Sequence, residues 1–159
     1  MKNLYSINVY RLFRSIMISA GCLSALSASA ALKITEIMPS NISTIISDKY
    51  DYNGYVEIYN DGEQVDLNGW TVTNEKEGKT DWTLRLSQSH VVKKGYNLLF
   101  FAKDDVAETQ GNSAANMNPL FIGTVSQKLT SDAGKLTLTN GSQTISIEYP
   151  KQYPHISYG

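Results

Sequence analysis

The amino-acid sequence predicts an all-β protein folded as a β-sandwich, and three observations lead to this prediction. Short runs in which apolar and polar residues alternate, typical of half-buried strands, recur along the chain. Turn-forming residues such as Asn140-Gly141 separate these runs at fairly regular spacing. No segment after the first 30 residues shows helical periodicity. About eight short strands with such turn signals are typical of a sandwich.

The first 30 residues differ from the rest of the chain, and we interpret them as a secretory signal peptide. Basic residues without an acid come first, then an apolar run over residues 15–27, then Ala28-Ser29-Ala30, the small-residue pattern of a cleavage site. Cleavage after Ala30 would leave residues 31–159 as one domain, secreted to the periplasm or extracellular space. The apolar run is shorter than the roughly 20 residues of a membrane-spanning helix. An uncleaved N-terminal anchor is the alternative.

Cys22 suggests a second processing route. Ser19-Ala20-Gly21-Cys22 is similar to a bacterial lipobox, although Ser19 stands where lipoboxes usually carry Leu, Val or Ile. Lipidation of Cys22 would make the protein a membrane-anchored lipoprotein. Because Cys22 is the only cysteine, residues 31–159 contain neither a disulfide nor a reactive thiol.

The first predicted strand covers residues 32–38 and ends before Pro39, which cannot donate to a β-ladder. Glu36 falls on the apolar face of this run, which predicts either a β-bulge or a buried glutamate with a partner. The polar residues 40–53 predict a surface loop. Residues 54–60 alternate again and predict the second strand.

The middle of the chain adds further strands and two tryptophans. Trp70 and Trp82 each begin an alternating apolar run, so we expect both in the core. Residues 96–102 are continuously apolar, which is typical of a strand buried on both faces. Residues 103–118 predict a long loop. Asn-Gly between the alternating runs 134–139 and 144–149 predicts a β-hairpin.

Charge argues against a nucleic-acid partner. The whole chain has 14 basic and 15 acidic residues, and three of the basic ones lie in the first 30. Residues 31–159 therefore carry 11 basic and 15 acidic residues, a net charge of −4, which offers no electrostatic footprint for a phosphate backbone. Only a basic face around Lys93, Lys94 and Lys103 would favour one.

Several segments together resemble the lamin tail domain family, in its bacterial secreted type. These are residues 32–41, Val-Glu-Ile-Tyr-Asn at 56–60, Asp-Leu-Asn-Gly-Trp at 66–70, Trp82, Lys94-Gly95-Tyr96, residues 129–134, and the ending Ser157-Tyr158-Gly159. The resemblance covers nearly all of residues 32–159. It implies an immunoglobulin-like β-sandwich that serves as an interaction or anchoring module, with no catalytic residues to carry over.

Two hypotheses for function follow, and a third concerns the length of the protein. The first is a secreted, non-enzymatic module that binds an extracellular or envelope protein or polysaccharide. The second is a carbohydrate-binding module. In the family, the Ser-Tyr-Gly ending is usually followed by more protein. The resemblance therefore implies that residues 31–159 are the N-terminal part of a longer chain, a targeting domain for a hydrolase or kinase-like domain beyond Gly159.

Tyrosines are the main candidate binding residues. Four of them cluster around one predicted loop and strand: Tyr50, Tyr52, Tyr55 and Tyr59. Exposed aromatic rings at this place would stack on sugars or form a protein-binding patch. The alternative is that they pack on the sheet and under the loop, which is common for tyrosines in strands.

Loop acids are the candidate metal ligands, and calcium is the only cofactor considered. Their side-chain oxygens suit calcium, although Lys49 interrupts the usual calcium-loop spacing. The candidates are Asp48, Asp51, Asn53, Asp104 and Asp105. Solvated loop acids are the alternative interpretation.

The remaining polar residues give no sign of catalysis. His90 and His155 lack the spacing of a metal pair or of a base beside a nucleophile, so we interpret both as surface histidines. The sequence has no Gly-Xaa-Ser-Xaa-Gly elbow and no phosphate-binding loop. We therefore expect that residues 31–159 are not an enzyme.

Overall fold

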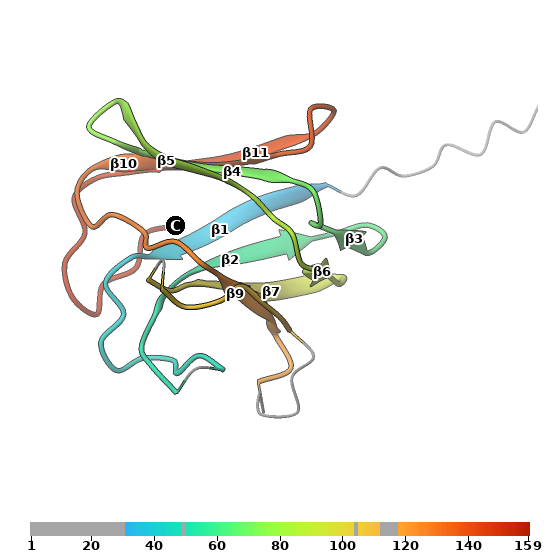
Figure 1. Cartoon of the computed structure of the whole chain (residues 1–159), viewed down its shortest axis with the longest axis horizontal. Coiled ribbons are helices and arrows are strands. Elements are labelled where there is room, and N and C mark those ends of the chain that lie inside the picture. Colours follow the sequence, from blue (N-terminus) through green and yellow to red (C-terminus); the bar gives the residue numbers. More distant parts are fainter. Residues whose placement is uncertain (1–30, 49, 104, 112–117) are drawn as a thin grey trace, which may run out of the picture.

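The computed structural model describes residues 31–48, 50–103, 105–111 and 118–159, and these residues form a β-sandwich without helices (Figure 1). The predicted signal peptide and Cys22 lie outside the described residues. Among the residues that are described, no helix is long and apolar enough to cross a membrane. The predicted all-β fold class is confirmed.

Two sheets face each other and a short ladder lies at one end (Figure 1). The five-stranded sheet has the order β1 (Leu32–Met38), β2 (Gly54–Asn60), β7 (Gly95–Phe101), β9 (Phe121–Val125) and β8 (Thr109–Gln110). The four-stranded sheet has the order β11 (Thr144–Tyr149), β10 (Gly134–Thr139), β4 (Thr71–Lys76) and β5 (Lys79–Arg85). The short ladder pairs β3 (Val65–Asp66) with β6 (Val91–Val92). Within these sheets, only β7 and β9 pair in parallel.

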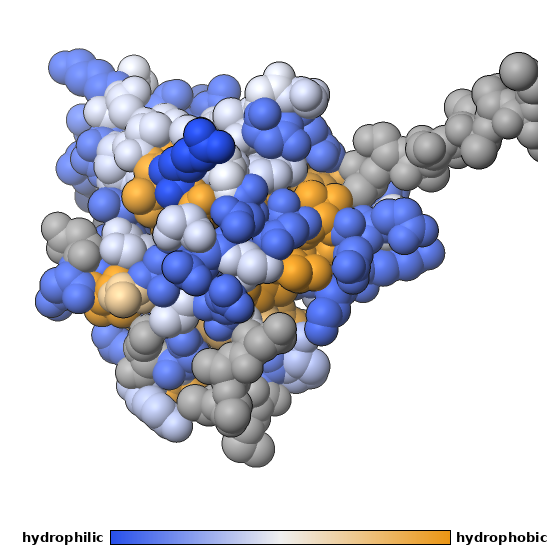
Figure 2. All heavy atoms as spheres, turned by 45° about the vertical axis from the view of Figure 1, so that its right-hand side comes forward, coloured by the Kyte–Doolittle hydropathy of each residue, from blue (hydrophilic) through white to orange (hydrophobic). Residues whose placement is uncertain are grey.

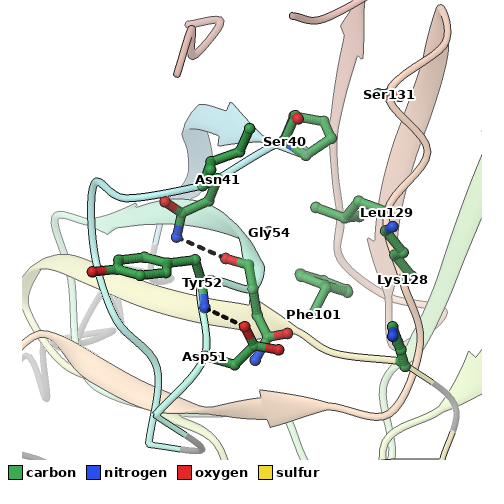
Figure 3. Close-up of a pocket in the computed structure, with 13 residues that line it drawn as sticks. Ser40, Asn41, Asp51, Tyr52, Gly54, Phe101, Lys128, Leu129 and Ser131 are labelled. Carbon is green, nitrogen blue, oxygen red and sulfur yellow. Dashed lines mark hydrogen bonds between the residues drawn. The ribbon is translucent and has the colours of Figure 1, made fainter. Parts of the chain in front are cut away.

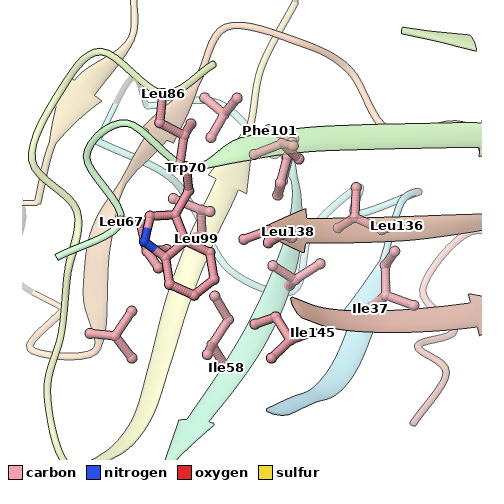
Figure 4. Close-up of a cluster of buried hydrophobic side chains, with 14 of the residues drawn as sticks. Ile37, Ile58, Leu67, Trp70, Leu86, Leu99, Phe101, Leu136, Leu138 and Ile145 are labelled. Carbon is pink, nitrogen blue, oxygen red and sulfur yellow. The ribbon is translucent and has the colours of Figure 1, made fainter. Parts of the chain in front are cut away.

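The main core fills the space between the two large sheets (Figure 4). Trp70 is buried in this core, together with leucines and isoleucines from both sheets. Trp82 is only partly buried against this core, and its indole N–H donates to the carbonyl of Lys128 at 2.9 Å. The core position predicted for Trp70 is confirmed, and that of Trp82 is confirmed in part.

A second hydrophobic cluster covers the outer face of the five-stranded sheet. Its buried members are Met38, Tyr55, Leu98, Phe100 and Phe121, and Ile45 from the loop between β1 and β2 packs against them. Alternate residues of β7 therefore face different cores, which explains why this strand is apolar from Leu98 to Phe101. The loop over residues 39–53 is consequently folded onto the sheet through Ile45.

β1 contains the irregularity that Glu36 predicts. The register between β1 and β2 shifts between Ile34 and Glu36, which is a β-bulge. The Glu36 carboxylate also has a partner, because the Tyr55 hydroxyl donates to its Oε1 at 2.9 Å. Burial and the hydrogen bond to Glu36 raise the pKa of Tyr55. The predicted β-bulge is thus confirmed, and Glu36 has a partner as expected, although its side chain is half-buried and not buried.

The predicted hairpin is also confirmed, whereas the predicted long loop holds an extra strand. β10 and β11 pair in register around Gly141, which has a φ of 90°. The loop expected over residues 103–118 contains β8, which pairs antiparallel with β9. β8 has only two residues, so it is too short to show an alternating pattern.

The C-terminal segment crosses from one sheet to the other. After β11, which belongs to the four-stranded sheet, the chain reaches the edge strand β1 of the five-stranded sheet. Ile37 and Tyr158 exchange two backbone hydrogen bonds of 2.8 and 2.9 Å. This pairing covers part of an edge that would otherwise present free backbone groups.

Candidate functional site

A cavity of about 240 Å³ lies at one end of the sandwich, between the loop 39–53 and the segment that joins β9 to β10 (Figure 3). Phe101 and Leu129, both buried, contribute apolar surface to it. Most of its other lining residues are polar. A concave site with some apolar surface and several polar groups is suited to a small polar ligand.

Asn41 holds the loop that forms one wall of the cavity. Its side-chain amide donates to the carbonyls of Ile45 at 2.6 Å and Asn53 at 2.9 Å, and its Oδ1 accepts from the Thr44 N–H at 3.0 Å. Asn41 is 6% exposed. One asparagine therefore satisfies backbone groups from both ends of this loop, and this fixes the position of the wall.

The four candidate tyrosines do not form one surface. Tyr52 lines the cavity and Tyr50 lies nearby in the same loop; they are 42% and 75% exposed. Tyr55 is buried in the second cluster. Tyr59, four residues along β2, packs against Tyr96 at a ring-centroid distance of 5.0 Å. Of the four, only Tyr52 both lines the cavity and is exposed to solvent.

Sequence reasoning missed several exposed apolar residues near this end. Ile42 and Ile46 are about half exposed, although they lie in a segment whose composition is largely polar. The C-terminal segment adds Tyr153 and Ile156, which are also exposed. His155 joins the two segments, since its N–H donates to the carbonyl of Ser40 at 3.2 Å. The prediction that His155 is a surface residue is confirmed.

Apolar residues elsewhere are scattered. Figure 2 shows the side of the molecule around β3 and β6, where hydrophobic residues appear in separate patches between hydrophilic ones. Scattered exposed apolar residues are normal for a folded domain and do not indicate a binding surface.

Asp48 uses its carboxylate to attach the loop 39–53 to the sheet. It accepts from the hydroxyl of Thr109 on β8 at 2.8 Å and from that of Thr124 on β9 at 2.7 Å. Both carboxylate oxygens therefore have a partner in the fold. Together with Asn41, this contact positions the loop beside the cavity.

The other candidate calcium ligands are spread over separate contacts. Asp51 accepts from the Tyr52 N–H at 2.8 Å, and the Asn53 side chain donates to the Ser47 hydroxyl at 2.9 Å. Asp105 is exposed, and Asp104 lies outside the described residues. No group of three His, Cys, Asp or Glu residues in the described ranges is arranged to hold a metal ion. Calcium binding stays a prediction.

The lysines considered for nucleic-acid binding are separated. Lys93 and Lys94 precede β7, and Lys103 follows it, so the strand lies between them. Seven residues of strand correspond to roughly 20 Å. Lys103 instead lines the cavity together with Lys128.

A comparison with known families identifies the fold. The family model described as Lamin Tail Domain matches residues 25–151, which include every strand from β1 to β11. The chain belongs to the lamin tail domain family. No curated protein matches the chain.

Membership in the lamin tail domain family agrees with the immunoglobulin-like sandwich seen here. It supports a binding or anchoring module, since this family is not generally enzymatic. The resemblance noted in the sequence is thereby confirmed.

His90 occupies an unexpected place in this lamin tail domain, and its predicted surface position is wrong. The side chain is fully buried. Its Nε2 lies 2.8 Å from Glu108 Oε1, and its Nδ1 lies 3.1 Å from the carbonyl oxygen of Ile122. Both ring nitrogens therefore have a polar partner within the fold. Sequence spacing missed this pair because the partners are far from His90 along the chain.

The Glu108 carboxylate accepts further hydrogen bonds besides its contact with His90. Ser87 donates to it through its backbone N–H and, at 2.6 Å, through its hydroxyl, and the Gln88 N–H lies 3.2 Å from it. Burial alone would raise the pKa of Glu108. The hydrogen bonds from Ser87, His90 and Gln88 outweigh burial and lower this pKa below 4.5.

Ser87, His90 and Glu108 are the residue types of a hydrolytic triad, but their arrangement is different. The Ser87 hydroxyl donates to the carboxylate and not to the imidazole. Both imidazole nitrogens already have partners inside the fold, and the ring is inaccessible to a substrate. A nucleophile needs its base within hydrogen-bond reach. These residues therefore stabilise the lamin tail domain and do not form a nucleophile with its base.

We expect the Glu108 contacts to make stability fall in acid. Because the folded pKa lies below the unfolded value, their contribution is complete above about pH 4.5 and is lost as the pH falls through the folded pKa. Glu108→Gln should cost about 2 kcal/mol at pH 7, since it weakens the hydrogen bonds that Ser87, Gln88 and His90 make to a charged carboxylate.

Urea unfolding between pH 7 and pH 3 measures this effect. The free energy of unfolding of the wild-type protein should exceed that of Glu108→Gln at pH 7, and this difference should shrink as the pH falls. Asp66 accepts hydrogen bonds from the backbone N–H of His90 and from the Ser89 hydroxyl, and its pKa is also lowered. Asp66 therefore also makes the domain less stable in acid. If this difference in the free energy of unfolding stays constant down to pH 3, the loss of stability in acid does not come from Glu108.

Proposed function

We propose that this lamin tail domain is a secreted, non-enzymatic binding module that attaches its chain to a polysaccharide of the cell envelope or extracellular space. The binding site is the cavity beside Tyr52. The supporting observation is a concave, mostly polar site with an exposed aromatic ring next to it, on a fold whose family serves as binding modules.

The polar groups of the cavity favour a sugar ligand. The hydroxyls of Ser40 and Ser131 line it and make no hydrogen bond with any described residue. The aromatic ring of Tyr52 lies on the side of the cavity opposite Lys128 and Leu129 (Figure 3). A sugar presents an apolar face that stacks on an aromatic ring and hydroxyls that pair with polar groups.

Replacing Tyr52 by alanine is expected to weaken polysaccharide binding about tenfold without unfolding the domain. The side chain is exposed, so its removal leaves the core intact. Co-sedimentation of the purified protein with isolated envelope polysaccharide measures the binding.

Tyr96→Ala is the matched control. Tyr96 is 54% exposed and lies at the end of β7 away from the cavity. The control should bind like the wild-type protein. Equal pelleting of Tyr52→Ala and Tyr96→Ala, or no pelleting of the wild-type protein, would contradict the proposed site. Chelation of calcium in a parallel sample tests the calcium hypothesis.

A protein partner is the second candidate, and one observation favours it. Ile42 and Ile46 are exposed on the loop beside the cavity, and exposed apolar residues that gather near one site often mark a protein interface. Ile42 also lines the cavity, whereas Ile46 does not. Replacing Ile46 with serine should therefore weaken capture of a protein partner and leave polysaccharide binding unchanged.

Secretion belongs to the same proposal. It rests on the pattern of the first 30 residues. The mass of the exported protein distinguishes the routes, because cleavage after Ala30 gives a free N-terminus at Ala31 and lipidation gives a modified Cys22. A targeting role for a longer chain stays a prediction from the family resemblance.

A further inference from the structure

We propose that the cavity recognises an acidic sugar, with Lys103 and Lys128 contacting its negative group. This inference rests on the proposed polysaccharide binding and specifies its chemistry. The shared feature of the ligand is an anionic group on a sugar ring, either a carboxylate or a phosphate.

The fold brings the two lysines to one cavity although they are distant in the sequence. Lys103 follows the end of β7, where the Ala102 N–H donates to the carbonyl of Val125 at 2.9 Å. The backbone of Lys128 accepts from the Trp82 indole, and its neighbour Leu129 is buried. The backbone beside each lysine is therefore held in place by hydrogen bonds within the sandwich.

Neither lysine has an acidic partner among the described residues, and both are exposed. Lys76 provides the contrast, since its ammonium pairs with Asp132 at 2.7 Å. Among the described residues, Asp51 is the only acid that lines the cavity, and one of its oxygens already accepts the Tyr52 N–H.

Charge selects the ligand class. The described residues of the lining supply two ammonium groups and one carboxylate, whereas residues 31–159 carry a net charge of −4. A locally positive cavity on an acidic domain attracts an anionic group and positions it. Lysine binds carboxylate and phosphate alike as a point charge. The unpartnered hydroxyls of Ser40 and Ser131 in the same lining point to a sugar in preference to a bare anion.

The test uses purified protein and isolated envelope polysaccharide in three forms: untreated, carboxyl-reduced, and freed of phosphate. Lys103→Gln and Lys128→Gln should each weaken binding to the untreated form about tenfold. Lys79→Gln, at the exposed start of β5 and outside the cavity, is the control and should bind normally.

Each outcome decides between the alternatives. Loss of binding after carboxyl reduction identifies a carboxylate, and loss after phosphate removal identifies a phosphate; either supports the inference. Unchanged binding of both treated forms, or of both lysine variants, overturns it and leaves the proposed function standing. Displacement by inorganic phosphate alone at low concentration would show that any anion is held, and it also overturns the inference. If the untreated polysaccharide does not bind, both proposals fail.

Discussion

Gly123→Ala is expected to destabilise the domain by about 4 kcal/mol or more, through overpacking and loss of the buried hydrogen bonds of His90. A Cβ atom at Gly123 would lie 2.0 Å from Nδ1 of His90 and 2.5 Å from the carbonyl oxygen of Thr109. The His90 ring is fully buried and held by Glu108, so it has no space to withdraw. Gly123 also has a φ of 146°, which L-residues rarely adopt.

Urea unfolding of Gly123→Ala and Gly141→Ala separates overpacking from backbone strain. Gly141 also has a positive φ, but a Cβ there would meet no atom within 4 Å. Gly141→Ala should lower the free energy of unfolding by only about 1–2 kcal/mol, which is the effect of the strained backbone conformation alone. In the double variant with His90→Ala, the cost of Gly123→Ala should become smaller, because the ring that it meets is gone. Equal costs for Gly123→Ala and Gly141→Ala would contradict this account.

Asn41→Ala is expected to release the loop that forms the cavity wall and to abolish ligand binding. The substitution removes four hydrogen bonds and leaves the N–H groups of Thr44 and Ile45 and the carbonyls of Ile45 and Asn53 without this partner. The loss of these part-buried hydrogen bonds should cost about 2–4 kcal/mol in total.

Hydrogen exchange is the measurement for Asn41→Ala. Amides in residues 39–54 should exchange faster, while those of β10 and β11 should keep their protection. Asn68→Ala is the control, since Asn68 is exposed and its side chain makes no hydrogen bond with a described residue. Unchanged exchange in residues 39–54 would show that the loop does not depend on Asn41.

Structural features that depend on a few neighbouring residues in the sequence could be predicted. β7 is apolar at every position after Asn97, and the structure places it between two hydrophobic clusters. Asn140-Gly141 specifies a turn through its own backbone preferences, and the hairpin forms there. Glu36 interrupts an alternating run, and the β-bulge lies at this place.

Features that depend on distant contacts could not be predicted. His90 resembles any polar residue before a turn, and only its approach to Glu108 and Gly123 explains its burial. Tyr55 and Tyr59 share the period of β2, yet the loop 39–53 covers only the first of them. Lys103 and Lys128 come to line the same cavity only when β7 and β9 pair.

The central claim is that ligand binding takes place at the cavity end of the sandwich. Titrating the isotopically labelled protein with soluble fragments of envelope polysaccharide, and following its backbone amide NMR signals, tests this claim most directly. We predict saturable shifts in residues 39–54, 101–103 and 128–131, with little change in β5 and β11. Shifts centred on β5 or β11, or no shift at saturating ligand, would contradict the account.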